Sequence, residues 1–299
     1  MTSTLPGSRS GISTPCCSAG TATSWATPPP GCDCRRAARP RRPRRPRRPM
    51  ARMMLHQDAS TRAWLEGQPP LDLVITFDDA TSARYSAVLV EQEGTASSFR
   101  GLAEVIERHG LFIGLYTDRG RHDFHTPQAG GKVSKTRLTQ VGRALKQLGI
   151  GHIAAYSPQA RGRCERAFRT LQDRLPKELR LAGITSVAAA NRYLREAWLA
   201  EHNARFAITP EEPASAFVKA PPELWLDLLC VQEERQVGND SCVRWRGRVL
   251  QIPSSPLRRH FVRATVRLHE YPDGSVTIFA GPHRLATFPP AEPVRKLAA

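Results

Sequence analysis

Three acidic side chains of this sequence could together bind divalent metal ions. Asp58 ends a short apolar run that begins at Met53, Asp118 follows another apolar run, and Glu165 opens a segment with helical periodicity. Carboxylate oxygens are the ligands that Mg²⁺ prefers, and a few of them can hold two ions about 4 Å apart. Such an ion pair stabilises both the attacking and the leaving oxygen when a phosphodiester is cleaved or joined. The acids therefore indicate metal-dependent phosphoryl chemistry.

Each of these acids also has a structural explanation when it is considered alone. An Asp at the end of a strand often caps a turn, and an acid in the first turn of a helix interacts favourably with the helix dipole. The combination is more specific, because the acids end a first strand, follow a fourth strand and begin the helix after a fifth. If the first and fourth strands are neighbours in one sheet, Asp58 and Asp118 project from the same edge.

The elements that would position these acids can be predicted from apolar periodicity. Alternating and β-branched runs predict strands, and apolar residues at three- and four-residue spacing predict helices. We expect strands over 53–58, 71–77, 85–90, 111–117 and 153–156, and helices over 95–109, 136–148, 161–181 and 187–206. Three strands followed by alternating helices and strands predict an α/β fold with helices packed on a mixed five-stranded sheet.

The helix over 161–181 carries the third acid next to its buried face. Phe168, Leu171 and Leu175 form an apolar stripe along this helix. Glu165 lies three residues before Phe168, so it borders the stripe and can reach toward the two aspartates.

Four sequence motifs give the segment from about Met53 to Phe217 a resemblance to a known family. They are His56-Gln57-Asp58, the turn Asp78-Asp79-Ala80-Thr81-Ser82, Tyr116-Thr117-Asp118-Arg119-Gly120, and the stretch YSPQARGRCER over 156–166. The segment resembles the catalytic core of retroviral integrases and bacterial insertion-sequence transposases, most of all the transposase group called ISNCY. The resemblance implies an RNase H-like fold and a DDE triad of Asp58, Asp118 and Glu165. It also implies two Mg²⁺ ions, for which Mn²⁺ can substitute, and DNA strand transfer by a homo-oligomer.

Two other acids compete for the first position of the triad. Asp78 and Asp79 end the second expected strand, which in this topology points to the opposite edge, and the resemblance places the first acid at Asp58. The 47-residue spacing from Asp118 to Glu165 is long for the wider superfamily, but a basic, Gly-containing loop over 121–135 accounts for the excess. His122 and His125 in this loop have no further ligands nearby in sequence, so we expect no metal site there.

The charge of the chain indicates a polyanionic partner. The formal net charge is +17, and residues 1–50 contain ten Arg against one acid, Asp33. Lys and Arg release counterions from phosphate, so a basic excess favours nucleic acid, although a solvated surface is the simpler alternative. Residues proposed to contact DNA are Arg119, Arg161, Arg163, Arg166 and Arg169 near the acids, and Arg244, Trp245 and Arg246 near the C-terminus. We therefore expect a cytoplasmic, nucleoid-associated protein.

Composition predicts four parts of the chain. Residues 1–50 are rich in Ser, Pro and Arg and are expected to form a disordered basic tail. Residues 51–217 would form the catalytic domain, 218–234 a linker, and 235–290 a small SH3-like β-barrel that binds DNA. The barrel is predicted from short alternating runs and from the turn at Asp273-Gly274. The seven Cys show no zinc-ligand spacing and no run of 18 apolar residues exists, so neither structural zinc nor a membrane span is expected.

The expected activity is metal-dependent DNA cleavage and strand transfer. Transposases of this kind usually carry N-terminal helix-turn-helix modules, and nothing upstream of residue 50 predicts one. The first 38 or so residues resemble a frame-shifted translation more than an evolved domain. Two alternatives follow: a truncated, inactive remnant that only binds DNA, and an RNase H-like nuclease that cleaves without joining.

Overall fold

The computed structural model describes residues 46–128, 131–134, 136–156, 162–256 and 258–291. The expectations for the tail before residue 46 and for Arg161 lie outside this part. No helix in the described residues is both long and apolar enough to cross a bilayer.

A five-stranded mixed sheet forms the centre of the part that contains the three candidate acids. Its strands are β2 (Leu55–Arg62), β3 (Leu71–Asp78), β4 (Arg84–Val90), β5 (Gly114–Thr117) and β6 (Gly151–Ala154), in the order β4-β3-β2-β5-β6. β2, β3 and β4 are antiparallel neighbours, whereas β5 is parallel to both β2 and β6. The expected mixed α/β sheet is confirmed, and an RNase H-like core fits this topology.

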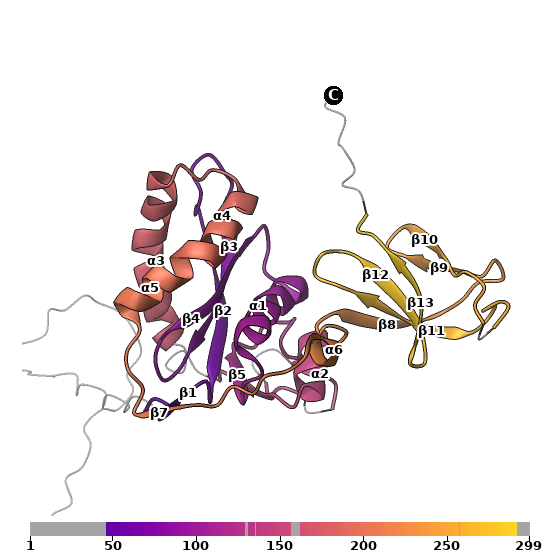
Figure 1. The fold of residues 1–299 in the computed structure, drawn as a ribbon, viewed down its shortest axis with the longest axis horizontal. Coiled ribbons are helices and arrows are strands. Elements are labelled where there is room, and N and C mark those ends of the chain that lie inside the picture. Colours follow the sequence, from indigo (N-terminus) through magenta and orange to yellow (C-terminus); the bar gives the residue numbers. More distant parts are fainter. Residues whose placement is uncertain (1–45, 129–130, 135, 157–161, 257, 292–299) are drawn as a thin grey trace, which may run out of the picture. The chain divides into compact units, whose positions relative to one another are not determined.

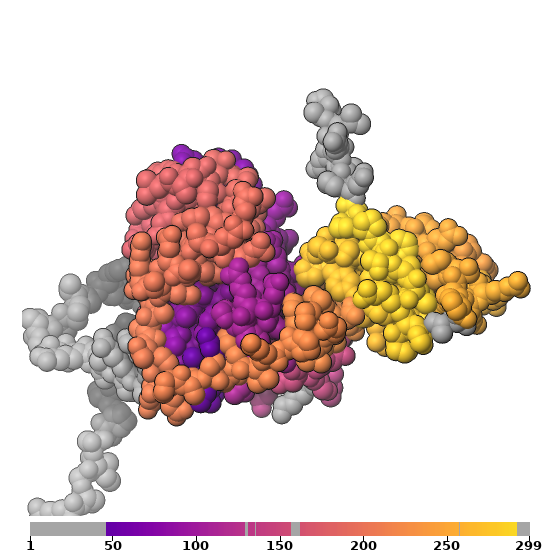
Figure 2. Space-filling model, in the orientation of Figure 1, coloured from indigo at the N-terminus to yellow at the C-terminus, as the bar shows by residue number. Residues whose placement is uncertain are grey.

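Helices cover both faces of the sheet (Figure 1). On one face are α1 (Thr95–His109) and α2 (Gln140–Gln147), which enclose a core with Leu55 and Leu115. On the other face are α3 (Gly162–Leu181), α4 (Val187–Tyr193), the π-helical turn η2 (Leu194–Trp198) and α5 (Leu199–Phe206). In the space-filling view, α3 to α5 form one continuous salmon-coloured layer at the upper left, and indigo strand atoms stay visible below it (Figure 2).

The expected helices are present, with boundaries set by local chemistry. α1 has the predicted bounds and ends at Gly110, whose φ of 106° suits glycine. α2 begins four residues later than predicted, because the hydroxyl of Thr139 accepts a hydrogen bond from the Gly142 amide and caps the helix. The helix predicted over 187–206 is interrupted by the π-helical turn.

A short parallel strand pair, which the sequence pattern does not predict, joins the two ends of this α/β part. β1 (Met50–Ala51) pairs with β7 (Glu212–Ser215), which follows the last helix of the core. The Glu212 amide donates to the Pro49 carbonyl at 3.0 Å, and the Ala216 amide donates to the Ala51 carbonyl at 3.2 Å.

The connector after β7 packs on the core. It contains the single helical turn α6 (Pro222–Trp225), and the Trp225 and Leu229 side chains are buried in the same cluster as α1 and α2. The Arg143 guanidinium of α2 donates to the carbonyls of Leu228 and Cys230, at 3.1 and 2.5 Å.

The C-terminal part is all β, as predicted. It contains β8 (Val231–Gln236), β9 (Cys242–Trp245), β10 (Arg248–Gln251), β11 (Thr265–Glu270), β12 (Val276–Ala280) and β13 (His283–Phe288). β9 and β10 form a hairpin, and the other four form a sheet in the order β13-β12-β11-β8. Both sheets contribute to one buried cluster that includes Trp245 and Phe261. The SH3-like barrel stays a prediction.

Candidate active site

Asp58 lies in the middle of a strand, and the expectation that it closes the first strand was wrong. β2 continues to Arg62, and Asp58 pairs with Ile75 of β3. The strand continues because Ser60 and Thr61 each find a polar partner. Gln172 of α3 donates to the Ser60 hydroxyl at 2.9 Å, and the Thr61 hydroxyl donates to Asp72 at 2.5 Å.

The parallel pairing of β2 and β5 brings the second acid to the level of the first. His56 is the register partner of Tyr116, and their rings lie 5.0 Å apart. Asp58 lies two residues further along β2, and Asp118 directly follows the last residue of β5, so the two acids lie at neighbouring levels of adjacent chain segments. The Asp118 carboxylate accepts a hydrogen bond of 2.7 Å from the Gly120 amide. A Cβ atom at Gly120 would lie 2.9 Å from that carboxylate, so a side chain there would displace Asp118.

This face of the sheet is the one covered by α3. Along β2, His56 and Ser60 point to α3: the His56 ring lies 3.9 Å from the Cys164 sulfur, and Ser60 bonds to Gln172. Side chains alternate between the two faces of a strand, so Asp58, two residues from both His56 and Ser60, points to the same face toward α3.

Glu165 lies on the edge of α3 that borders this face. It precedes Gln172 by seven residues, which is two helical turns, so the two side chains share one side of the helix. Gln172 contacts the sheet, whereas Glu165 is exposed at the start of the helix. Within the described residues, no three His, Cys, Asp or Glu side chains are grouped closely enough to form a ready-made metal site.

A buried acid that the sequence analysis did not single out lies beside the two aspartates. Asp123 is 4% exposed, and its pKa is raised to about 8, by burial first and then by the negative charges of Asp118 and Glu93, with a smaller effect from Asp58. His122 lies 3.5 Å from both Asp123 and Glu93. The sequence offers only a weak signal for this group, an acid five residues after Asp118.

Acidic side chains are therefore concentrated around Asp58 and Asp118. Burial is the main cause that keeps Asp123 protonated at neutral pH, and repulsion from the carboxylates of Asp118, Glu93 and Asp58 adds to it. Hard divalent cations relieve the same repulsion without a proton. Asp58 and Asp118 thus suit such a cation in chemistry and in placement.

Asp78 and Asp79, the competing acids, are fully buried and have structural partners. Asp78 accepts hydrogen bonds from the amide and hydroxyl of Thr81, at 2.8 and 2.9 Å, and so caps the turn between β3 and β4. Asp79 forms an ion pair with Arg163 and bonds to the His56 ring at 2.8 Å. Asp79 therefore ties the first turn of α3 to β2, next to the candidate site.

The arginines proposed to contact DNA differ in how they are held. Arg166 and Arg169 are exposed on α3, whereas Arg163 is partly buried by its pair with Asp79. Arg119 donates to the Gly131 carbonyl at 2.8 Å and lies over the Tyr156 ring.

In the C-terminal part, the aromatic residue proposed to contact DNA is a core residue. Trp245 is 4% exposed, and its ring lies under the guanidinium groups of Arg235 and Arg246. Arg244 and Arg246 are exposed on either side of it. Any contact with DNA at this hairpin therefore falls to the arginines and not to stacking on the indole.

Comparison with known proteins gives two sequence relatives. The chain is 32% identical over 224 residues to "Putative transposase y4bF" of Sinorhizobium fredii, an alignment that covers 74% of this chain and 48% of the relative. It is 30% identical over 216 residues to "Transposase for insertion sequence IS1202" of Streptococcus pneumoniae, covering 72% of this chain and 46% of the relative. Its sequence relatives are transposases. The chain spans about half the length of the curated relatives it matches. No protein-family model matches it.

Three solved structures that overlap this chain come from retroviral integrases or an intasome, with TM-scores below 0.5. The catalytic core of human T-cell lymphotropic virus 2 integrase, solved with magnesium, overlaps 49% of this chain and 85% of its own, with a TM-score of 0.36 and 15% identity. A chain of the simian T-cell lymphotropic virus intasome, solved in complex with the PP2A regulatory subunit B56 gamma, overlaps 82% of this chain and 78% of its own, with a TM-score of 0.41 and 16% identity. The core of bovine immunodeficiency virus integrase overlaps 54% and 91%, with a TM-score of 0.35 and 20% identity. Similarities this low carry no conclusion about activity.

Proposed function

We propose that this protein is a DNA transposase that cleaves and joins DNA strands with a DDE triad of Asp58, Asp118 and Glu165. The observation that carries the proposal is the parallel pairing of β2 with β5, because Asp58 lies in β2 and Asp118 directly follows β5 at the neighbouring level. The similarity to two transposases over about three quarters of the chain supports it. The finer assignment, to the ISNCY group, rests on the four sequence motifs.

The proposed metal ligands are the three acids of the triad. Asp58 and Asp118 would hold divalent cations, Mg²⁺ or Mn²⁺, and Glu165 would complete the set from the first turn of α3. The two ions would supply charge stabilisation at the attacking and leaving oxygens of the phosphodiester. Glu93 adds negative charge beside the protonated Asp123, which favours cation binding at this edge.

The rest of the core keeps these acids in position. The Gly120 amide orients Asp118, and the Asp79–Arg163 ion pair holds the first turn of α3 that carries Glu165. In this arrangement no side chain needs to act as a covalent nucleophile, because water and later a 3′-hydroxyl of DNA attack the phosphodiester directly.

The proposal divides the chain into a basic tail (1–50), a catalytic domain (51–217), a linker (218–234) and a C-terminal DNA-binding domain (235–290). DNA, as element ends and as target, is the proposed partner. Arg119, Arg161 and Arg169 would contact its backbone near the acids, Arg163 and Arg166 would do so from another flank of α3, and Arg244 and Arg246 would do so in the C-terminal domain. Phosphate contacts of this kind position DNA without reading its sequence. Assembly of several copies on DNA belongs to the same proposal.

A strand-transfer assay tests the proposal. Purified protein, Mg²⁺ or Mn²⁺ and pre-cleaved duplex DNA are incubated for the wild type, for Asp118→Asn and for Asp173→Asn. Asp173 is a matched control, because it is an exposed acid on α3 that pairs with Lys177 at 2.9 Å. We expect joined products from the wild type and Asp173→Asn, and at least a hundredfold loss in Asp118→Asn with DNA binding retained.

The products distinguish the proposal from its rivals. Cleaved strands without joined strands would identify a nuclease, and DNA binding without products would identify an inactive remnant. Equal activity of Asp118→Asn and wild type would refute the assignment of the triad.

A further inference from the structure

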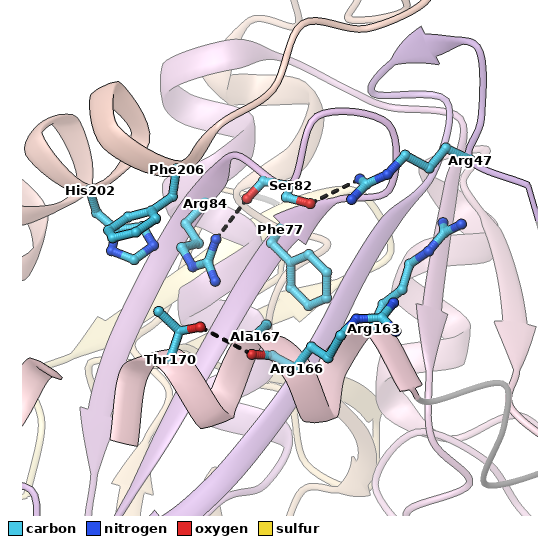
Figure 3. Close-up of a pocket in the computed structure, with 10 residues that line it drawn as sticks. All are labelled: Arg47, Phe77, Ser82, Arg84, Arg163, Arg166, Ala167, Thr170, His202 and Phe206. Carbon is cyan, nitrogen blue, oxygen red and sulfur yellow. Dashed lines mark hydrogen bonds between the residues drawn. The ribbon is translucent and has the colours of Figure 1, made fainter. Parts of the chain in front are cut away.

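A basic pocket lies on the flank of α3 that points away from Glu165. It has a volume of about 190 Å³ and is lined by the arginines Arg47, Arg84, Arg163 and Arg166, together with His202 and Phe206 of α5 (Figure 3). On α3 its residues recur at the three- and four-residue spacing of one helical face, Arg163, Arg166 and Thr170. Glu165 and Gln172 share a different face of the helix, so the pocket is separate from the candidate active site.

The charge of this pocket is positive and unbalanced. No carboxylate is among the described side chains that line it, and only Arg163 has a buried acid, Asp79, as its ion-pair partner. The pKa of Arg47 is lowered, first by burial and then by the positive charge of Arg166. The cationic groups therefore repel one another across the pocket.

Arg84 is the most buried of the four arginines. It is 5% exposed, its Nη1 donates to the Ser82 carbonyl at 2.8 Å, and its Nε finds no hydrogen-bond acceptor among the described residues. Burial lowers the pKa of Arg84 to about 10, so the guanidinium stays charged at neutral pH. A buried cation without a nearby acid is costly unless an anion accompanies it.

His202 lines the opposite wall of the pocket and carries no charge. Its pKa is lowered to about 3 by burial and by the positive charges of Arg84 and other arginines, so the ring is neutral. The Nε2 atom of this buried ring is also without a hydrogen-bond partner in the described part of the chain. In Figure 3 the Arg84 guanidinium points into the space between the His202 and Phe206 rings and the Phe77 ring.

The fourth arginine comes from the basic arm before the core. Arg47 donates to the carbonyls of Asp79 and Ala80, at 2.8 and 2.9 Å, and to the Ser82 hydroxyl at 2.9 Å. These bonds fix its guanidinium at the rim of the pocket, next to the turn between β3 and β4. Donors from the arm, β4 and α3 thus converge on one small volume.

We propose that this pocket binds a phosphate group of a DNA strand. A phosphate presents several acceptor oxygens in different directions, which suits guanidinium donors that come from three separate elements. The Arg-rich sequence that leads into Arg47 favours a polyanion over a free small anion. The choice of DNA as the polyanion rests on the proposed function, whereas the phosphate site rests on the pocket alone.

Calorimetric titration with inorganic phosphate, at constant ionic strength with chloride, tests the phosphate site. The variants are Arg84→Gln and Thr170→Glu, and the second leaves the buried arginine in place while adding a negative charge to the pocket wall. Arg180→Gln is the control, because Arg180 is exposed near the end of the same helix. We expect saturable binding to the wild type and the control, and at least tenfold weaker binding to both variants. Absence of binding to the wild type, or equal binding to folded Thr170→Glu, would overturn the proposal.

Titration with DNA distinguishes the two sources of the phosphate. Oligonucleotides with a 5′-phosphate or a 5′-hydroxyl are bound to the same four proteins over a range of salt. A backbone site predicts that both variants lose affinity for both oligonucleotides, with the salt slope reduced by about one. A site for a strand end predicts a loss for the 5′-phosphorylated oligonucleotide only. Unchanged DNA affinity in both variants would refute DNA as the ligand.

The two proposals can fail separately. Asp118→Asn leaves the pocket intact, so phosphate should bind to it as to the wild type. Phosphate binding without any strand transfer by the wild type would contradict the proposed function and leave the pocket standing. Strand transfer by a protein that binds no phosphate would do the reverse.

Discussion

Replacing Asp79 by Asn separates an acid that holds the fold from the acids that we assign to chemistry. Asp79 is fully buried, and its carboxylate accepts from the Arg48 amide at 2.9 Å and from His56 at 2.8 Å, in addition to its ion pair with Arg163. Asn keeps the size of the side chain but has no charge and one acceptor oxygen fewer. We therefore expect a loss of stability and a displaced first turn of α3.

The size of the stability loss depends on the charge of Arg163, which loses its partner in the Asp79→Asn variant. Removing one partner of a buried ion pair costs about 3–5 kcal/mol, because the other charge is left uncompensated. Arg163 is 16% exposed and reaches water in part, so the lower end, about 3 kcal/mol, applies. For a chain of this size, that lowers the midpoint of thermal unfolding by about 6–12 °C.

Urea unfolding, followed by tryptophan fluorescence, measures the effect, because Trp64 and Trp198 lie in the core that α3 covers. Asp58→Asn is the matched control: Asp58 is half-buried among other carboxylates, so losing its charge should change stability by less than about 1 kcal/mol while abolishing strand transfer. Asp79→Asn with the urea midpoint of the wild type, or Asp58→Asn with full activity, would refute the distinction.

Two further predictions concern stability. Asp123 has its folded pKa raised from 3.8 to about 8, so without metal the free energy of unfolding should fall as pH rises from about 4 to 8, by at most about 1.4 kcal/mol per pH unit. Urea unfolding at several pH values should show a flatter profile for Asp123→Asn, and identical profiles would contradict the burial argument. Gly110→Ala should cost more than about 3 kcal/mol, because its φ is 106° and a Cβ would lie 2.3 Å from the Val218 carbonyl oxygen. Gly149→Ala, with φ of 73° and open space around it, should cost only about 1–2 kcal/mol, and similar losses at both sites would count against the clash.

Local periodicity was enough to predict the elements that carry most of the core. α1 has the predicted bounds because its apolar stripe is continuous and a glycine ends it. β3 and β4 lie within one residue of the predicted ranges, since both are apolar and are bounded by polar turns. The order of these elements therefore sufficed for the mixed sheet.

Features that depend on distant partners were not predictable in this way. β2 extends past Asp58 because polar residues there find partners on β3 and α3, which periodicity does not show. Asp123 looks like an ordinary loop acid until the fold buries it beside Asp118. The basic pocket joins residues as far apart as Arg47 and His202, so no sequence window contains it.

The pairing of β1 with β7 has a mechanical consequence. The two strands are parallel, so the start of β1 and the end of β7 lie at opposite ends of the pair, and Arg47 and the connector after β7 provide further attachment to the core on either side of it. Tension between the flanking segments, such as arises when both are attached to one DNA molecule, would pull the two strands lengthwise past each other. Their hydrogen bonds then share the load at the same time instead of breaking one after another. The pair would thus resist shear and protect the sheet, and the acids on it, from force applied through the chain.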